Sequence, residues 1–231
     1  MTQNWHQVWE ARRIDRTRPG VLAQLLAADG MDTGFGSVSE DSWTRYVLAM
    51  AETVGIHAGA SVFEVGCGAG AWLYQLDRLG CRVAGLDGSS TLIGYAREHL
   101  PNGHWAVGDA ASLELEPQYD FVVSSGVFLY FPSLDYAQNV LARMVAKARR
   151  GLLILDVPDL SLREAALAER RRIAGDAYSA RYAGLDHLYY DRAWFHAMLT
   201  QLGANRSAIR DQAIDGYMNS RHRFNVIAWI E

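Results

Sequence analysis

The sequence predicts an α/β domain built around a mostly parallel β-sheet. Through the middle of the chain, short apolar runs alternate with amphipathic stretches, which is typical of repeated strand–helix units. The runs are apolar without alternation, as expected for strands that helices cover on both faces. Near the C-terminus, two runs are joined by a loop that is too short for a parallel crossover. The last strand should therefore lie antiparallel to its neighbour.

The boundaries of the predicted elements follow from glycine and proline. The apolar run at 61–65 ends in a glycine turn, and the helix after it, 71–79, is closed by Gly80. Strand 82–86 precedes helix 91–100, which Pro101 stops. Three more strands are expected at 104–107, 120–124 and 151–157, with a helix at 134–148 after Pro132. Helix 192–202 ends at Gly203, and the closing strands are 208–214 and 224–230.

We expect one domain, 1–231, in four parts. Residues 57–157 form the core, and 192–231 add the last helix and the strand pair. Residues 1–56 hold two or three helices, the last at 40–54 with Ser39 as its N-cap, and serve as a lid. Residues 158–191 are an insertion with a helix at 160–174 followed by tyrosine-rich segments.

Composition restricts the possible partners. The net charge of −4 over 231 residues favours neither nucleic acid nor an anionic membrane, and no apolar run is long enough to span a bilayer. The N-terminal residues lack the apolar stretch of a signal peptide, so we expect a cytoplasmic monomer or homodimer. Seven scattered histidines and two cysteines, Cys67 and Cys81, predict neither a metal site nor a disulfide.

Polar residues follow three consecutive strands of the predicted sheet. The first strand ends in a loop with Gly66, Gly68 and Gly70, which lets backbone N–H groups approach a ligand. Asp87 ends the second strand, where it suits a ribose diol, and Asp109 after the third suits an exocyclic amine. Because ligands bind at the carboxyl ends of parallel strands, these residues predict a nucleoside site.

The glycine spacing distinguishes two cofactor classes. A dinucleotide site would show Gly-x-Gly-x-x-Gly, whereas this chain has Gly-x-Gly-x-Gly with Glu64 two residues ahead. A carboxylate at that place would repel a pyrophosphate but suit the cationic amino end of S-adenosylmethionine. We therefore expect S-adenosyl-L-methionine as the cofactor and S-adenosyl-L-homocysteine as its product.

The stretch from Glu64 to Gly70 resembles the first motif of the class I S-adenosylmethionine-dependent methyltransferases. Residues 85–89 are similar to the acidic end of that family's second strand, residues 108–110 to its adenine-contacting motif, and residues 119–126 to its fourth-strand motif. The resemblance implies a Rossmann-like three-layer sandwich whose seven-stranded sheet has the order 3-2-1-4-5-7-6. The expected cofactor-binding residues are Glu64, Gly66, Cys67, Gly68, Gly70, Asp87, Gly88, Ser89, Asp109, Ala110 and Ser124, joined by Phe35 and Tyr46 of the lid.

The resemblance implies methyl transfer to an oxygen or nitrogen of a small molecule. The loop after the fourth strand has neither the Asn/Asp-Pro-Pro-Tyr/Phe motif of nucleic-acid adenine methyltransferases nor the metal-binding aspartate of the catechol type. Two other functions remain open. One is a nucleotide-dependent oxidoreductase, which the glycine spacing disfavours. The other is a partner subunit that binds the cofactor and catalyses nothing.

Candidate catalytic residues come from loops beside the predicted site. His187 is the first candidate for a general base, although a histidine bonded to a backbone carbonyl is an equal alternative. Tyr130 and Tyr190 are further candidates. The run Arg170–Arg172 is interpreted as a solvated helix face, with docking of an acidic carrier or a phosphorylated substrate as the alternative, and the small-molecule acceptor is expected to be anionic or carrier-bound. Trp5 and Trp9, on one helical face, either close over the cofactor or pack the first helix onto the domain.

Overall fold

A seven-stranded sheet with the order β3-β2-β1-β4-β5-β7-β6 forms the centre of the molecule in a computed structural model that describes residues 4–31 and 38–231. The strands are β1 (Ser61–Val65), β2 (Arg82–Asp87), β3 (His104–Val107), β4 (Tyr119–Ser125), β5 (Ala148–Pro158), β6 (Arg206–Asp211) and β7 (Arg223–Trp229). The first five run parallel, whereas β7 is antiparallel to both β5 and β6. The predicted fold class, strand order and reversed last strand are confirmed.

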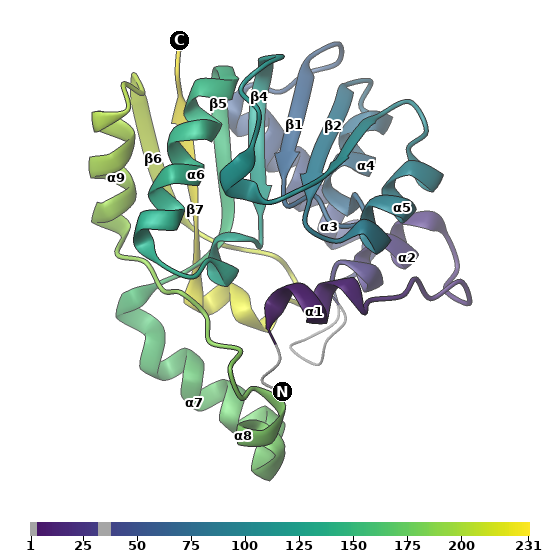
Figure 1. Cartoon of the computed structure of the whole chain (residues 1–231), viewed down its shortest axis with the longest axis vertical. Helices are drawn as coiled ribbons and strands as arrows, with labels where there is room; N and C mark the ends of the chain where they lie inside the picture. Colours follow the sequence, from purple (N-terminus) through teal and green to yellow (C-terminus); the bar gives the residue numbers. More distant parts are fainter. Residues whose placement is uncertain (1–3, 32–37) are drawn as a thin grey trace.

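Helices cover both faces of the sheet (Figure 1). The described α-helices are α1 (Trp5–Glu10), α2 (Val21–Ala28), α3 (Glu40–Val54), α4 (Ala71–Arg78), α5 (Ser90–His99), α6 (Leu134–Lys147), α7 (Arg163–Ala174), α8 (Tyr178–Arg181) and α9 (Arg192–Gln201). Short 3-10 helices are η1 (Ala110–Ser112), η2 (Phe128–Tyr130), η3 (Leu160–Leu162), η4 (Gly175–Ala177) and η5 (Met218–His222). Ser39 caps α3 as predicted, because its side chain accepts a hydrogen bond from Ser42 N.

Neighbouring residues of one strand face two different cores. Val62 of β1 packs with α2, α3, α4 and α5, whereas Phe63 and Val65 pack with α6 and α9. This division follows from the period of two along a strand, which sends successive side chains to opposite faces. Glu64 shares the face of Val62, so its carboxylate points toward the side of the sheet that α4 covers. The alternation therefore buries a carboxylate beside the start of α4.

Five of the observed strands have bounds that differ by one to three residues from the expected ones, and β3 differs in its burial. The run at 208–214 starts earlier, at Arg206, and stops at Asp211, which pairs with Phe224. Strand β3 was expected to be covered on both faces, but three of its four residues are exposed and Val107 is 49% exposed. It is an edge strand, which has one neighbour and less helical cover.

The expected helix at 160–174 is divided at its start. Asp159 caps the 3-10 helix η3 by accepting hydrogen bonds from the backbone and side chain of Ser161, and α7 begins only at Arg163. The local bonds of an aspartate favour such a turn over a regular helix start. Apart from this division, the helix lies where the sequence predicts it.

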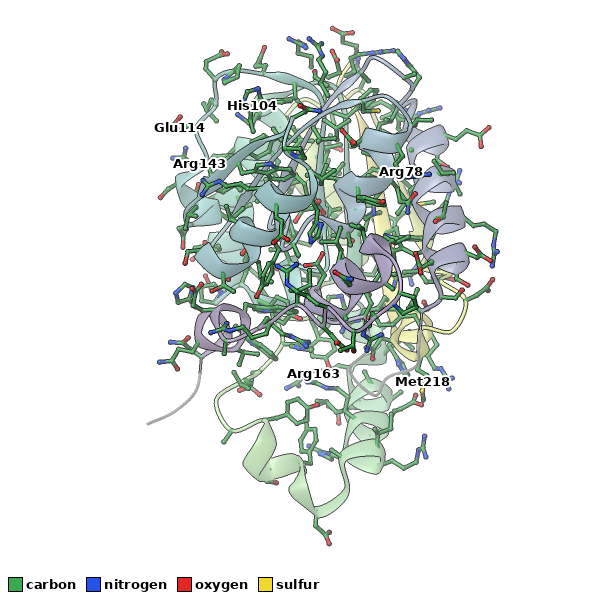
Figure 2. All side chains as sticks on the ribbon, turned by 90° about the vertical axis from the view of Figure 1, so that its right-hand side faces the viewer. Arg78, His104, Glu114, Arg143, Arg163 and Met218 are labelled. Atoms are coloured by element: carbon green, nitrogen blue, oxygen red, sulfur yellow. The ribbon has the colours of Figure 1, made fainter. Side chains whose placement is uncertain are left out.

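One end of the sheet carries the elements that surround the site. Figure 1 shows α1 crossing beneath the strands and α7 with α8 projecting beyond them, while the C-terminus lies at the opposite end. Figure 2 places Arg163 and Met218 at this junction, where α7 contacts η5, and Arg78 and His104 toward the other end. None of the described helices combines the length and the hydropathy needed to cross a membrane.

Candidate active site

A cavity of about 810 Å³ lies at the carboxyl ends of the parallel strands. Residues from α1, from the ends of β1, β2, β4 and β5, and from α7 line it. This is where parallel α/β sheets bind their ligands. The cavity has two parts of different chemistry, one rich in carboxylates and one with two arginines, which are described in turn.

The glycine-rich loop forms one wall of the carboxylate part. Gly66 and Gly68 have φ angles of 73° and 53°, which favour glycine, and the loop bends back so that Gly68 N donates to Asp87 Oδ2 over 2.8 Å. Ser89 N donates to the other oxygen of Asp87 over 2.7 Å. Asp87 therefore holds the loop and the start of α5 together while it lines the cavity.

Asp29, at the end of α2, contacts the same loop. Its carboxylate accepts hydrogen bonds from Ala69 N over 2.6 Å and from Ala71 N over 3.0 Å, at the start of α4. Burial raises its pKa to about 7, and the charge of Asp87 adds to this effect. In the sequence, Asp29 looks like an ordinary residue at a helix end before Gly30. The sequence offered no signal for this contact, which joins segments 40 residues apart.

Glu64 adds a third carboxylate to this wall. Its side chain is 2% exposed, and its Oε2 atom has no hydrogen-bond partner in the part of the chain that the structure describes. Burial raises its pKa well above the ordinary value, and the charges of Asp29 and Asp87 raise it further. An unpartnered buried carboxylate oxygen beside two more acids fits a cationic donor such as the ammonium group of S-adenosylmethionine.

The other predicted cofactor residues divide into two groups. Cys67, Gly88, Ser89, Asp109 and Ala110 line the cavity with the residues above. Asp109 accepts a hydrogen bond over 2.6 Å from the hydroxyl of Tyr136, which also lines the cavity and which the sequence analysis did not select.

Three predicted residues support the site from behind. Gly70 caps α4, Ser124 donates to Val65 O over 2.9 Å inside the core, and Tyr46 donates to Asn225 Oδ1 over 3.1 Å. None of the three lines the described cavity. Phe35 lies outside the residues that the structure describes.

Aromatic rings surround the second part of the cavity. The ring of Tyr130 lies 4.6 Å from that of Trp5 and 5.5 Å from that of Trp9, while His187 lies 5.1 Å from Trp5. All four line the cavity. Helix α1 therefore covers this part of the cavity, and closure of Trp5 and Trp9 over the cofactor stays a prediction.

His187 is held by an arginine. Nη1 of Arg170 donates to Nδ1 of His187 over 3.1 Å. Because a guanidinium can only donate, Nδ1 accepts and the neutral ring carries its hydrogen on Nε2. Burial lowers the pKa of His187 well below its ordinary value, and the charges of Arg170 and Arg223 lower it further. The arrangement favours a hydrogen-bond donor, rather than the general base that the sequence suggested.

Arg170 differs from the other arginines of its run. It is 6% exposed and lines the cavity, whereas Arg171 and Arg172 are exposed. The interpretation of Arg170–Arg172 as a solvated face is therefore wrong for Arg170. One helical turn contains both faces of an amphipathic helix, so three successive residues cannot share one environment.

Tyr190 lies away from the cavity. Its side chain is fully buried in the core of α6 and α9, and its hydroxyl donates to Phe128 O over 2.8 Å. Tyr190 is close in sequence to His187, which lines the cavity, and this suggested a shared pocket. Its side chain packs into the core instead. Tyr130, from η2, does reach the cavity.

Asp156 is a further residue that the sequence analysis missed. It interrupts β5 at a bulge with a φ of 60°, and the bulge lets its side chain reach the cavity. Its carboxylate accepts from Gln212 Nε2 over 2.9 Å and from the hydroxyl of Tyr217 over 3.1 Å, and lies 3.6 Å from Nε of Arg223. A lone carboxylate in an apolar strand was the signal that could have revealed it.

Among the described residues, no group of three or more histidine, cysteine, aspartate or glutamate side chains is arranged to hold a metal ion. Cys67 and Cys81 are both free and buried.

Comparison with known proteins shows what the central part of the chain is similar to. Residues 62–151 match the family model described as a methyltransferase domain. The trans-aconitate 2-methyltransferase of Methylobacterium nodulans is 32% identical over 149 residues, 62% of this chain and 55% of that protein. The magnesium-protoporphyrin O-methyltransferase of Rhodobacter capsulatus is 27% identical over 151 residues, 63% and 66% of the two chains. The chain thus spans about half to two thirds of these relatives.

Solved structures share the fold over nearly the whole chain. Magnesium protoporphyrin IX methyltransferase from Synechocystis, solved with S-adenosylhomocysteine, has a TM-score of 0.60 at 19% identity, covering 91% of this chain and 98% of that one. An N-methyltransferase from Bradyrhizobium japonicum, also solved with S-adenosylhomocysteine, has a TM-score of 0.62 at 17% identity, covering 98% and 97%. With the sheet order, these matches show that residues 62–151 are similar to a methyltransferase domain and that the chain has the Rossmann-like fold of the class I S-adenosylmethionine-dependent methyltransferases.

Proposed function

We propose that the chain transfers a methyl group from S-adenosylmethionine to an oxygen or nitrogen atom of a small-molecule acceptor. One observation carries the proposal. A single cavity joins the carboxylates at the ends of β1 and β2 to a second part lined by aromatic rings and arginines. The first part suits a cationic cofactor and the second leaves room for an acceptor next to it. Several relatives are named as methyltransferases of small molecules, which supports the same conclusion.

Four side chains are assigned to the cofactor. The free oxygen of Glu64 accepts from its ammonium group, Asp87 from its ribose and Asp109 from its adenine amine. Arg12, which lines the cavity near Asp29, is assigned to its carboxylate. When bound, S-adenosylmethionine supplies a methyl carbon made electrophilic by the positive sulfur. The acidic wall favours that positive charge, which the product lacks.

The residues of this chain align the acceptor and exclude water. A lone pair of the acceptor forms the bond to the methyl carbon, and the electron pair of the broken carbon–sulfur bond remains on sulfur. Trp5 and Tyr130 enclose the place of this displacement, which removes competing water and fixes the approach.

A neutral hydroxyl or amine must also lose a proton. Asp156 is the candidate to take it, because it lines the cavity and burial raises its pKa, which makes its carboxylate a stronger base. His187 is assigned a different role, donation of the Nε2 hydrogen to an acceptor oxygen. An acceptor that reacts through an anionic oxygen needs no base.

Titration calorimetry with S-adenosylmethionine, S-adenosylhomocysteine and NAD tests the proposal. We expect both sulfur nucleosides to bind and NAD not to bind, which separates a methyltransferase from the oxidoreductase alternative. Glu64→Gln should weaken S-adenosylmethionine about tenfold or more, since a buried charge-assisted hydrogen bond is lost. Glu52→Gln, on the exposed side of α3, is the matched control. Failure of S-adenosylhomocysteine to bind would overturn the proposal.

Activity requires a second measurement. Formation of S-adenosylhomocysteine is followed against panels of hydroxylated, carboxylated and amino compounds. Normal cofactor binding without turnover of any panel member would favour the alternative of a non-catalytic partner subunit.

A further inference from the structure

Two guanidinium groups line the part of the cavity formed by α7, β5 and β7. Arg170 comes from α7 and Arg223 from the start of β7, and each is 6% exposed. Both charges act on the same neighbours, since both lower the pKa of His187 and both oppose the rise that burial causes in the pKa of Tyr130. Burying an arginine is costly unless an anion compensates its charge. The partners of each arginine therefore indicate what belongs beside them.

The contacts of Arg170 involve no anion. Its Nη1 donates to the neutral ring of His187, and its guanidinium lies 4.8 Å from the ring centre of Tyr182. No carboxylate forms a salt bridge with it in the described part of the chain. Glu169, its neighbour on α7, instead faces Arg221 and His222. Among the described residues, Arg170 is thus a buried cation without a counter-ion.

The charge of Arg223 is only partly compensated by a carboxylate. Its Nε lies 3.6 Å from Asp156 Oδ1, beyond hydrogen-bond distance, and its buried Nη1 has no hydrogen-bond partner among the described residues. The Asp156 carboxylate is already bonded to Gln212 and Tyr217. Within the described part of the chain, two guanidinium charges therefore face one carboxylate, which leaves an excess of one positive charge in this part of the cavity.

We propose that the methyl acceptor carries a carboxylate group, which Arg170 and Arg223 bind. This inference rests on the proposed methyltransferase function and names its substrate class. A guanidinium presents paired N–H donors that match the two oxygens of a carboxylate. One carboxylate balances the single excess charge, whereas a phosphate monoester at neutral pH carries close to two. The Nε2 hydrogen of His187 adds a third donor beside the arginines.

The charges that line the cavity are distributed as this proposal requires, with carboxylates on one side and arginines on the other. S-adenosylmethionine has a net charge of +1 and faces the wall of Asp29, Glu64 and Asp87. The acceptor carboxylate faces Arg170 and Arg223. Each ligand therefore meets the opposite charge, and an acceptor would be repelled from the cofactor wall. This polarity orients the acceptor before the reaction.

The test uses the full chain saturated with S-adenosylhomocysteine. Benzoate, benzamide and phenyl phosphate are titrated in turn while the side-chain N–H resonances of the arginines are followed by nuclear magnetic resonance. We expect saturable shifts of Arg170 and Arg223 with benzoate and none with benzamide, which has the same shape without the charge. Arg170→Gln should weaken benzoate about tenfold or more, and Arg170→Lys should retain part of the affinity. Arg171→Gln, one residue away and exposed, should change nothing.

The following results would overturn the proposal. Benzoate that fails to shift either arginine, or that binds Arg170→Gln as well as the wild type, overturns the inference. Tighter binding of phenyl phosphate than of benzoate overturns the carboxylate in favour of a phosphate. The binding of S-adenosylhomocysteine is measured first and separately. Its failure refutes the proposed function, whereas normal binding without any anion effect refutes only the substrate class.

Discussion

Arg170 donates a hydrogen bond to Nδ1 of His187 over 3.1 Å, and this contact fixes the histidine as a neutral ring with its hydrogen on Nε2. The pKa of His187 lies well below its ordinary value because of burial and the charges of Arg170 and Arg223. We therefore predict that His187 does not titrate between about pH 6 and pH 8. Nitrogen-15 resonances of the ring report the tautomer and its titration. Arg170→Gln should raise the pKa, and a wild-type ring that titrates near its ordinary value would contradict the prediction.

Cofactor affinity should depend on pH through the acidic wall. In the protein without cofactor, Asp29 has a pKa of about 7, and the pKa of Glu64 is raised as well. A cationic ligand stabilises the charged carboxylates, so binding releases protons and becomes tighter as the pH rises. We predict that the Kd for S-adenosylmethionine falls from about pH 6 to pH 8.

Calorimetry in two buffers of different ionisation enthalpy measures the released protons directly. Glu64→Gln removes one titrating group and should reduce the number released. A Kd that is constant with pH, or one that rises, would argue against protonated carboxyl groups at this wall.

Gly68 should tolerate no side chain. Its φ of 53° is already unfavourable for other residues, and a Cβ atom there would overlap the carboxylate of Asp29. We predict that Gly68→Ala weakens S-adenosylmethionine binding by about tenfold or more, because Asp29 must move away from Ala69 and Ala71. Gly59→Ala is the control, since Gly59 has a φ of 86° and nothing within 4 Å of the added carbon. Equal effects of both changes on binding would show that backbone strain alone is responsible.

Asp156 should be needed for stability as well as for the site. Its carboxylate is the one described ion-pair partner of the buried Arg223, which would lose its counter-ion in Asp156→Asn. We predict that the free energy of unfolding falls by about 3 kcal/mol, measured by urea denaturation. Asparagine tolerates the positive φ, so the backbone does not explain the loss.

The control for this prediction is Asp211→Asn. The Asp211 side chain is 81% exposed and pairs with Arg192 at the surface, so its loss should matter little. Similar losses for both variants would indicate that the buried network around Arg223 contributes no more than a surface pair.

Trp5 should affect the acceptor more than the cofactor. Its ring packs against Tyr130 and His187, and its Nε1 donates to Asp186 O over 2.9 Å, so it joins α1 to the insertion. We predict that Trp5→Ala raises the acceptor KM several-fold with a small change in the Kd for S-adenosylmethionine, because the cover over the acceptor part is lost. A change confined to the cofactor would place the acceptor elsewhere.

The sequence alone predicted the strand order of the sheet and the motif residues that line the carboxylate part of the cavity. Strands β1 and β3 begin and end where the apolar runs predict, because each run is bounded by residues that break the local pattern, although only β1 is buried throughout. Glu64, Asp87 and Asp109 could also be located in the sequence. Glu64 interrupts the first apolar run, Asp87 ends the second and Asp109 follows the third. Their assignment to the cofactor remains a prediction that the binding experiments test.

Packing between distant elements brings further residues into contact with these side chains. Asp29 reaches the glycine-rich loop from a separate helix, Arg170 turns inward from a basic run, and Tyr190 turns into the core. Such contacts depend on how distant elements pack and on which face of a helix is covered, and neither is written in local periodicity. The sequence thus specifies most of the strands and the polar residues at their ends, while the packing of α1, α2 and α7 against them decides which charges line the cavity.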